Sequence, residues 1–245
     1  MFLVFVVNKD EYKNELDDFA KNISNDFDKI EGIFVNLNPS KTNKILSSKT
    51  IKIYGSDYII EKLKDKQFKI GATSFFQVNP LCAIRLFDVV KENVCNNSVF
   101  LDCYGGVGAI SVWVSDLCKK IVLIEENKEA TKLAKENYEL NNIKNYEIIE
   151  ADARKYLDNL KEDFTCVVLD PPRAGCSKEG LVAVSKRTNK IIYVSCNPQT
   201  LRRDIDILRE CGFEAQNIQP VDMFPYTHHI ECVCVLIKQQ KSRAI

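Results

Sequence analysis

The chain has 245 residues, a length that fits one large domain with a small additional unit better than two full domains. Hydrophobic residues make up 45% and charged residues 28%, which is typical of globular proteins and excludes disordered and fibrous classes. Because 34 basic residues balance 34 acidic ones, the overall charge does not predict nucleic-acid binding, and any site for a polyanion has to be local.

The apolar runs FLVFVV and VCVLI are far shorter than the roughly 20 residues that span a membrane. The first run passes directly into NKDEYKNE, without a basic flank before it or a cleavage site after it. We therefore expect no signal peptide, no membrane contact and a cytoplasmic location.

The ten cysteines are scattered and include no CxxC pair. Cys166, Cys232 and Cys234 stand inside apolar runs, which predicts reduced, buried thiols rather than disulfides. His228 and His229 alone cannot form a tetrahedral zinc site, so we expect no metal.

The first 70 residues predict a small α+β subdomain, in which short apolar runs surround one amphipathic segment. The expected elements are a strand over 2–7, a helix over about 10–23 and strands over 30–37 and 50–54. NPSKTN, at 38–43, is the expected turn between the last two strands.

From about residue 97 each strand-like run is followed by a helical one, which predicts a parallel, doubly wound sheet. The strand-like runs are VFLDCY, KIVLIEE, YEIIEAD, TCVVLDPP and KIIYVSCN. The last two runs, GFEAQNIQPVDM and IECVCVLIKQ, have no helix between them and predict an antiparallel hairpin that closes the sheet. The predicted fold class is therefore α/β, with residues 1–70 as the subdomain and residues 71–245 as the main domain.

A glycine cluster stands where the first strand of this sheet turns into its helix. Gly105, Gly106 and Gly108 lie in LDCYGGVGAI, and backbone without Cβ lets a ligand approach such a turn. The next strand ends in Glu125, at the spacing of about 20 residues that suits hydrogen bonds to ribose hydroxyls. A tight turn without a ligand is the alternative interpretation.

Further carboxylates are predicted at the same edge of the sheet, since Asp152 follows the third strand and Asp170 the fourth. For each carboxylate of this edge, Glu125 included, a helix N-cap is the structural alternative. The loop lacks the GxGxxG pattern and a P-loop lysine, so S-adenosylmethionine fits better than a dinucleotide or a triphosphate.

Cys196 ends the fifth strand, directly before a helix expected to begin near Gln199. A helix N-terminus lowers the pKa of a thiol, so we expect Cys196 to be a nucleophile rather than one more buried cysteine. If the last strand runs antiparallel beside the fifth, Glu231 opens it at the same edge and faces Cys196. The double proline of LDPPRAGC directs Asp170 and Arg173 into this cleft.

A thiolate, a carboxylate base and a methyl donor together suit methylation of carbon 5 of uracil. Addition of a thiolate to carbon 6 makes carbon 5 nucleophilic, and a carboxylate then removes the proton from carbon 5. Arg173 is placed to stabilise the enolate charge.

The sequence resembles the RNA (uracil-5-)-methyltransferases, which methylate uridines of bacterial ribosomal and transfer RNA. The resemblance covers nearly the whole chain and rests on FFQVNP at 75–80, LDCYGGVG at 101–108, LDPPRAG at 169–175, VSCNP at 194–198 and FPYTHHIE ending at Glu231. It implies a class I methyltransferase fold, S-adenosylmethionine as cofactor and RNA as partner.

The resemblance also implies roles for individual residues. Cys196 is similar to the family's nucleophile and Glu231 to its base, with Asp170 and Arg173 beside them. The expected donor-binding residues are Gln77, Tyr104, Gly105, Gly106, Glu125, Asp152 and Asp170. Phe75 and Asn79 are the expected contacts of the substrate, Phe75 by stacking on a flipped uracil, although Phe75 and Phe76 suit a hydrophobic core equally well.

Two features of the family do not occur in this sequence: an N-terminal TRAM domain of OB-fold type and a four-cysteine iron-sulfur cluster. The chain then corresponds to a fragment or to a short member. FFQVNP and NPSKTN look closest to the ribosomal branch, so ribosomal RNA is favoured over transfer RNA. The alternatives are a nucleic-acid amino methyltransferase and a donor-binding RNA chaperone or inactive remnant. A local phosphate-binding patch or, as the more common alternative, a solvated helix surface is expected for Lys186, Arg187, Lys190, Arg202 and Arg203.

Overall fold

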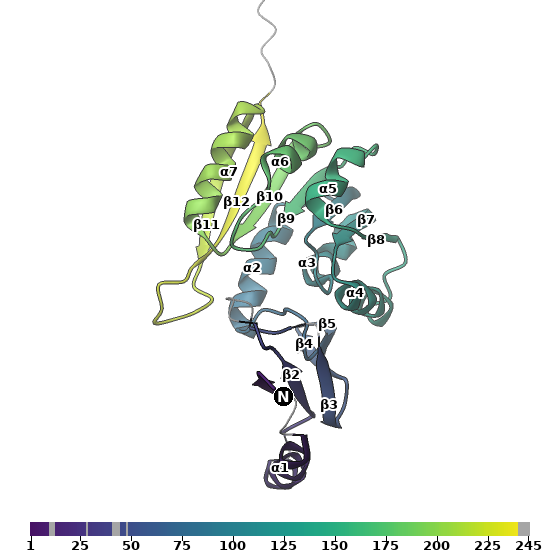
Figure 1. Cartoon of the computed structure of the whole chain (residues 1–245). Coiled ribbons are helices and arrows are strands. Elements are labelled where there is room, and N and C mark those ends of the chain that lie inside the picture. Colours follow the sequence, from purple (N-terminus) through teal and green to yellow (C-terminus); the bar gives the residue numbers. More distant parts are fainter. Residues whose placement is uncertain (10–12, 28, 41–44, 48, 240–245) are drawn as a thin grey trace, which may run out of the picture. The chain divides into compact units, whose positions relative to one another are not determined.

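The computed structural model describes residues 1–9, 13–27, 29–40, 45–47 and 49–239 (Figure 1). The chain divides into two compact units: Met1–Lys62 with Gln67–Phe75, and Leu63–Lys66 with Phe76–Ile245. Each unit buries its own cluster of apolar side chains.

The first unit is built on a three-stranded sheet. Its elements are β1 (Phe2–Val7), α1 (Lys13–Asp26), β2 (Gly32–Leu37) and β3 (Thr50–Gly55). β1 pairs with β2 in parallel and β2 with β3 antiparallel, and Ala20 of α1 is buried with Ile33 of β2. The strand predicted over 2–7 is confirmed, whereas the start predicted for the helix, 10–12, and positions 41–43 of the NPSKTN turn lie outside the described residues.

Three elements were not among those predicted: the hairpin of β4 (Tyr58–Leu63) and β5 (Lys66–Gly71), and helix α2 (Pro80–Glu92). The signal for α2 is present in the sequence, because Asn79 caps it and proline occupies its first position. Its buried residues follow the spacing of one helical face: Ala83, Leu86, Phe87 and Val90.

The second unit contains a seven-stranded sheet in the order β11-β12-β10-β9-β6-β7-β8. Its strands are β6 (Ser98–Cys103), β7 (Cys118–Glu125), β8 (Tyr146–Glu150), β9 (Cys166–Leu169), β10 (Lys190–Ser195), β11 (Phe213–Val221) and β12 (Glu231–Lys238). β6 to β10 are parallel, and β12 is antiparallel to both β10 and β11. This confirms the predicted doubly wound α/β sheet with a terminal antiparallel hairpin.

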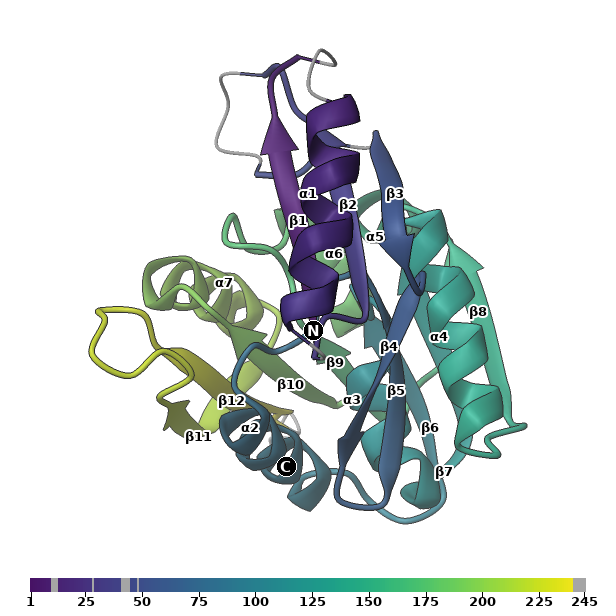
Figure 2. The ribbon, with the colours of Figure 1, turned by 90° about the horizontal axis from the view of Figure 1, so that it is seen from below.

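Helices cover both faces of this sheet (Figure 2). They are α2, α3 (Ala109–Val114), α4 (Lys128–Leu140), α5 (Ala153–Tyr156), α6 (Lys178–Ser185) and α7 (Pro198–Glu210). α5, α6 and α7 share one hydrophobic cluster with alternate residues of the strands, such as Leu101, Val167 and Tyr193. α3 contacts α2 and α4 on the opposite face.

The carboxyl ends of the parallel strands meet at one edge, where the chain reverses its winding between β6 and β9. Open α/β sheets bind ligands at this reversal point. The N–H of Asp170 donates to the carbonyl of Cys103 at 3.3 Å, and the N–H of Ala151 to that of Glu125 at 2.9 Å. These bonds hold the loops that carry the predicted site residues. In the described part of the chain, no helix has the length and apolar character needed to cross a membrane.

Candidate active site

The turn after β6 depends on two glycines. A Cβ added at Gly105 would lie 2.6 Å from the Leu123 side chain, so only glycine lets the turn pack on β7. Gly106 has a φ of +54°, and a Cβ there would meet nothing within 4 Å. The turn is thus closely packed on one side and open on the other.

Glu125, the last residue of β7, is held firmly beside this turn. Its Oε2 accepts a hydrogen bond from the Gly106 N–H at 3.0 Å, and its Oε1 accepts one from the Asn127 N–H at 2.8 Å. A carboxylate has about four acceptor positions, so two main-chain bonds orient it and leave capacity for a ligand. This geometry suits the predicted contact with ribose hydroxyls.

Asp102 of β6 was missed in the sequence, although it stands as a lone carboxylate inside the apolar run VFLDCY. It is buried, and its Oδ2 accepts a hydrogen bond from the Ser111 hydroxyl. Its Oδ1 has no partner among the described residues. Burial raises the pKa of Asp102 to about 6, with the charge of Glu125 acting in the same direction. An orphaned oxygen next to the glycine turn fits a polar ligand or a water molecule.

The predicted antiparallel placement of β12 beside β10 is confirmed. β10 and β12 are antiparallel neighbours in which Ser195 pairs with Cys232. The next residue of one strand, Cys196, therefore lies opposite the first residue of the other, Glu231. Glu231 is buried, with 6% of its surface exposed, and Cys196 is half-buried.

The expected lowering of the Cys196 pKa is wrong. Burial raises the pKa of the Cys196 thiol, and the charges of Glu231 and Asp170 add to this while Arg173 opposes it. The cap of α7 is Asn197, whose Oδ1 accepts from the Gln199 N–H at 3.1 Å. Cys196 therefore lies outside the helix cap, and desolvation and carboxylates outweigh the helix terminus.

The two carboxyl groups near Cys196 also have raised pKa values. Burial raises the pKa of Asp170 to about 8, with Glu231 and Asp102 contributing, so the protonated form prevails at neutral pH. Burial raises the pKa of Glu231, and Arg173 opposes this shift. Raised pKa values are typical of carboxyl groups that act as acids or bases.

Arg173 is the cation of this cluster, and its side chain is held by His229. Arg173 Nη2 lies 3.1 Å from His229 Nδ1. Partial desolvation and the charges of His228 and Arg173 lower the pKa of His229. His229 is therefore neutral at neutral pH, and its Nδ1 can accept the hydrogen bond from Arg173.

The residues predicted to contact the substrate come from the segment directly before α2. Phe75 belongs to the first unit and is 70% exposed. Asn79 caps α2, and its Oδ1 accepts from the Cys82 N–H at 3.3 Å. Gln77 is buried just before α2. Their roles toward donor and substrate remain predictions.

The remaining predicted donor contacts lie on the sheet edge. Tyr104 adopts a φ of +62° between β6 and the glycine turn, a left-handed conformation that is uncommon for a non-glycine residue. Asp152 directly precedes α5, and its carbonyl accepts from the N–H groups of Lys155 and Tyr156, each at 3.0 Å. Asp152 thus stands directly before a helix, and its predicted role toward the donor stays a prediction.

Most of the predicted basic patch is already paired. Arg202 binds Asp206 at 2.9 Å, and Arg203 binds Asp204 at 2.7 Å. Arg187 lies 3.7 Å from Asp163. Carboxylates therefore neutralise much of the charge that a phosphate would need.

All ten cysteines are unpaired, and Cys166, Cys232 and Cys234 are buried, as the sequence predicts. Among the described residues, no group of three or more histidine, cysteine, aspartate or glutamate side chains is arranged to hold a metal ion.

The strand order and the terminal hairpin are those of a class I S-adenosylmethionine-dependent methyltransferase. Within this class the chain belongs to the tRNA (uracil-5-)-methyltransferase family, whose model matches residues 10–239. This confirms the resemblance inferred from the motifs.

The chain is similar to an uncharacterized RNA methyltransferase of Oceanobacillus iheyensis, with 40% identity over 96% of this chain and 52% of the relative. An uncharacterized RNA methyltransferase of Clostridium tetani is 35% identical, over 96% of this chain and 52% of the relative. The chain thus spans about half the length of the curated relatives it matches.

A solved structure of similar fold is the Pyrococcus abyssi tRNA (uracil-54, C5)-methyltransferase in complex with S-adenosyl-L-homocysteine. It is 29% identical, with a TM-score of 0.72 over 87% of this chain and 53% of that chain. The Methanocaldococcus jannaschii tRNA m1G37 methyltransferase shares the fold at 16% identity, with a TM-score of 0.67 over 97% of this chain and 73% of that chain.

Proposed function

We propose that residues 71–245 form a catalytic domain that transfers a methyl group from S-adenosylmethionine to carbon 5 of uridine in RNA. The observation that supports this most strongly is the placement of Cys196 and Glu231 on adjacent ends of β10 and β12. A nucleophilic thiol beside a carboxylate with a raised pKa is what this reaction requires.

The donor-binding part of the proposal rests on the glycine turn between β6 and α3. S-adenosylmethionine supplies a methyl group on a positively charged sulfur when it is bound. The open space at Gly106 gives room for it, and Glu125 has acceptor capacity left for the ribose hydroxyls. The set of residues proposed to hold the donor is Gln77, Tyr104, Gly105, Gly106, Glu125, Asp152 and Asp170.

In the proposed reaction the thiolate of Cys196 attacks carbon 6 of uracil, and the electron pair of the 5,6 double bond moves toward oxygen 4. The charge of Arg173 favours both the thiolate and the resulting enolate. After carbon 5 has gained the methyl group, the Glu231 carboxylate removes the proton from carbon 5. The bond between sulfur and carbon 6 then breaks and Cys196 leaves as thiolate. A raised pKa makes Glu231 a stronger base for this step.

Analysis of the product nucleosides tests this proposal. RNA without 5-methyluridine is incubated with the chain and S-adenosylmethionine, and the nucleosides are identified by mass spectrometry. We expect 5-methyluridine with the parent and none with Cys196→Ala. Cys95→Ala is the matched control, because Cys95 is an exposed thiol outside the site, and it should behave as the parent does. Methylation of an exocyclic amine, or full activity of Cys196→Ala, would contradict the proposal.

We further propose ribosomal RNA as the preferred substrate, on the basis of FFQVNP and the NPSKTN region. Unmodified ribosomal and transfer RNA in parallel reactions distinguish the two substrates. Faster methylation of transfer RNA would reverse the preference without changing the proposed chemistry.

A further inference from the structure

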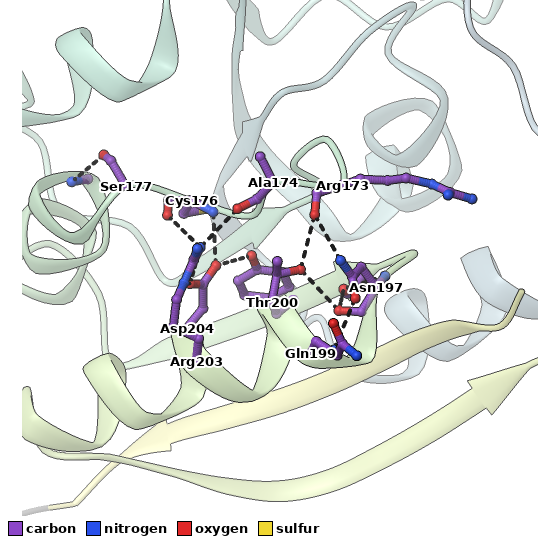
Figure 3. Close-up of polar contacts among 12 residues, drawn as sticks. Arg173, Ala174, Cys176, Ser177, Asn197, Gln199, Thr200, Arg203 and Asp204 are labelled. Carbon is purple, nitrogen blue, oxygen red and sulfur yellow. Dashed lines mark hydrogen bonds and ion pairs between the residues drawn. The ribbon is translucent and has the colours of Figure 1, made fainter. Parts of the chain in front are cut away.

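The loop that carries Arg173 is hydrogen-bonded to the cap and the first turns of α7 (Figure 3). The Arg173 carbonyl accepts a hydrogen bond from Asn197 Nδ2 at 3.2 Å and one from Thr200 Oγ1 at 3.3 Å. α7 is also the helix that follows Cys196 directly. The main chain of Arg173 and that of Cys196 are therefore connected through one rigid element.

Arg203 extends this connection along the loop. Its Nη2 donates to the carbonyls of Ala174 at 3.0 Å and Cys176 at 3.1 Å, and its Nε donates to Asp204 Oδ1 at 2.8 Å. One guanidinium thus binds two loop carbonyls and a carboxylate, a geometry that a lysine cannot reproduce.

Asp204 completes the network from inside the protein. Its Oδ2 accepts hydrogen bonds from the Cys176 N–H at 2.9 Å and from the Tyr193 hydroxyl of β10. Asp204 is fully buried, whereas half of the Arg203 side chain is exposed. A buried carboxylate with donors on both oxygens fixes the positions of all the groups that bind it.

Gly175 shows how closely the loop approaches these side chains. It has a φ of +74°, and a Cβ there would lie 2.6 Å from both Arg203 Nη2 and Asp204 Oδ2. Substitution at Gly175 would therefore push the loop away from α7 or displace the pair. Side chains of α7 bind the main chain of Arg173, Ala174 and Cys176. The Arg173 side chain takes no part in these bonds and contacts His229 instead.

We propose that Arg203 and Asp204 are positioning residues, which hold the main chain of residues 173–176 on α7 and so keep the Arg173 side chain in its contact with His229. The proposal deepens the function given above and rests on it only in treating Cys196 as the reacting group. Neither residue needs to touch the substrate or the donor.

The reactivity of the Cys196 thiol tests this positioning directly. Iodoacetamide alkylation is followed against pH, and the Cys196 peptide is quantified by mass spectrometry so that the other cysteines do not interfere. Arg173 favours the thiolate, so a displaced Arg173 should move the midpoint of the alkylation profile to higher pH. If the pKa of the thiol rises by about one unit, the thiolate fraction at neutral pH falls about ten-fold, while each thiolate becomes about three-fold more nucleophilic. We therefore expect alkylation of Cys196 to be about two- to three-fold slower at neutral pH.

The variants separate positioning from stability. Arg203→Lys should shift the midpoint upward, whereas Arg202→Lys, on the same helix and bound to Asp206 at 2.9 Å, should not. Arg173→Met should shift it too, and adding Arg203→Lys to Arg173→Met should cause no further shift, because Arg203 acts through Arg173.

Two outcomes would overturn the proposal: a lowered Tm for Arg203→Lys with an unchanged midpoint, or an additional shift in the double variant. If Arg203→Lys does not fold, Gly175→Ala perturbs the same contact from the loop, and an unchanged midpoint there would refute the proposal equally. The assay contains neither RNA nor donor, so its result stands even if the chain methylates no uridine.

Discussion

Replacement of Gly106 by alanine separates donor binding from folding stability. The added Cβ would meet nothing within 4 Å, so the folded chain loses only the cost of a left-handed conformation, about 1 kcal/mol. For a protein of this size that corresponds to a fall in Tm of about 2–4 °C. If the donor crosses the open side of the turn, the Cβ occupies its space.

Gly212→Ala is the matched control. Gly212 has a φ of +90°, and the nearest atom to an added Cβ is Lys238 Cγ at 4.0 Å, so the variant likewise places alanine at a positive φ, outside the proposed site. Calorimetry with S-adenosylhomocysteine should show affinity at least about ten-fold weaker for Gly106→Ala, which is about 1.4 kcal/mol, and unchanged for Gly212→Ala. Equal affinities for the two variants would refute the placement of the donor over Gly106.

Other substitutions test the remaining parts of the site. Glu125→Ala should weaken S-adenosylhomocysteine binding by about 1.5–3 kcal/mol in calorimetry, since charge-assisted hydrogen bonds are lost, and unchanged affinity would place the ribose elsewhere. Glu231→Gln should stall after methylation as a denaturation-resistant RNA adduct on a gel, and normal turnover would exclude Glu231 as the base. Glu231→Gln should also speed Cys196 alkylation and Arg173→Met should slow it, because the carboxylate raises the thiol pKa and the guanidinium lowers it; shifts of the same sign would contradict this geometry. Folding raises the pKa of Asp170 from 3.8 to about 8. The contribution of this group to the free energy of unfolding is therefore fully present below pH 3.8 and is lost as the pH rises toward 8, because the folded chain then has to keep or lose a proton that the unfolded chain has already released. The Tm of Asp170→Asn should therefore depend less on pH over this range than the Tm of the parent, and parallel curves would argue against a buried Asp170.

The sheet could be predicted because its strands are continuous apolar runs separated by helical patterns. The antiparallel place of β12 followed from the lack of a helix between the last two strands, and it brought Cys196 and Glu231 to the same edge. Helix α2 was not predicted, although the cap Asn79, the proline that follows it and the apolar spacing of its buried face all indicate a helix.

The electrostatics of the site could not be predicted from local sequence. The helix that follows Cys196 suggested a lowered pKa, but burial and the carboxyl groups of Asp170 and Glu231, which come from other strands, reverse the sign. Asp102 was overlooked for the same reason, because only the packed structure shows that one of its oxygens is buried without a partner.

The network around Asp204 depends equally on contacts between distant segments. In the sequence, Arg202, Arg203 and Asp204 are three adjacent charged residues that suggest a solvated helix surface. In the structure, Arg202 is largely exposed, whereas Asp204 is fully buried against the loop after β9. The sequence alone could not show that Asp204 is buried, and the structure separates the buried Asp204 from the exposed Arg202 beside it.

Covalent capture of Cys196 by RNA that contains 5-fluorouridine is the most direct test of the proposed chemistry. Fluorine at carbon 5 cannot be removed as a proton can, so the methylated adduct should persist after denaturation. We predict an adduct that requires S-adenosylmethionine and maps to the peptide of Cys196. A chain that methylates ordinary uridine yet forms no adduct, or one that is captured at another cysteine, would contradict nucleophilic catalysis by Cys196.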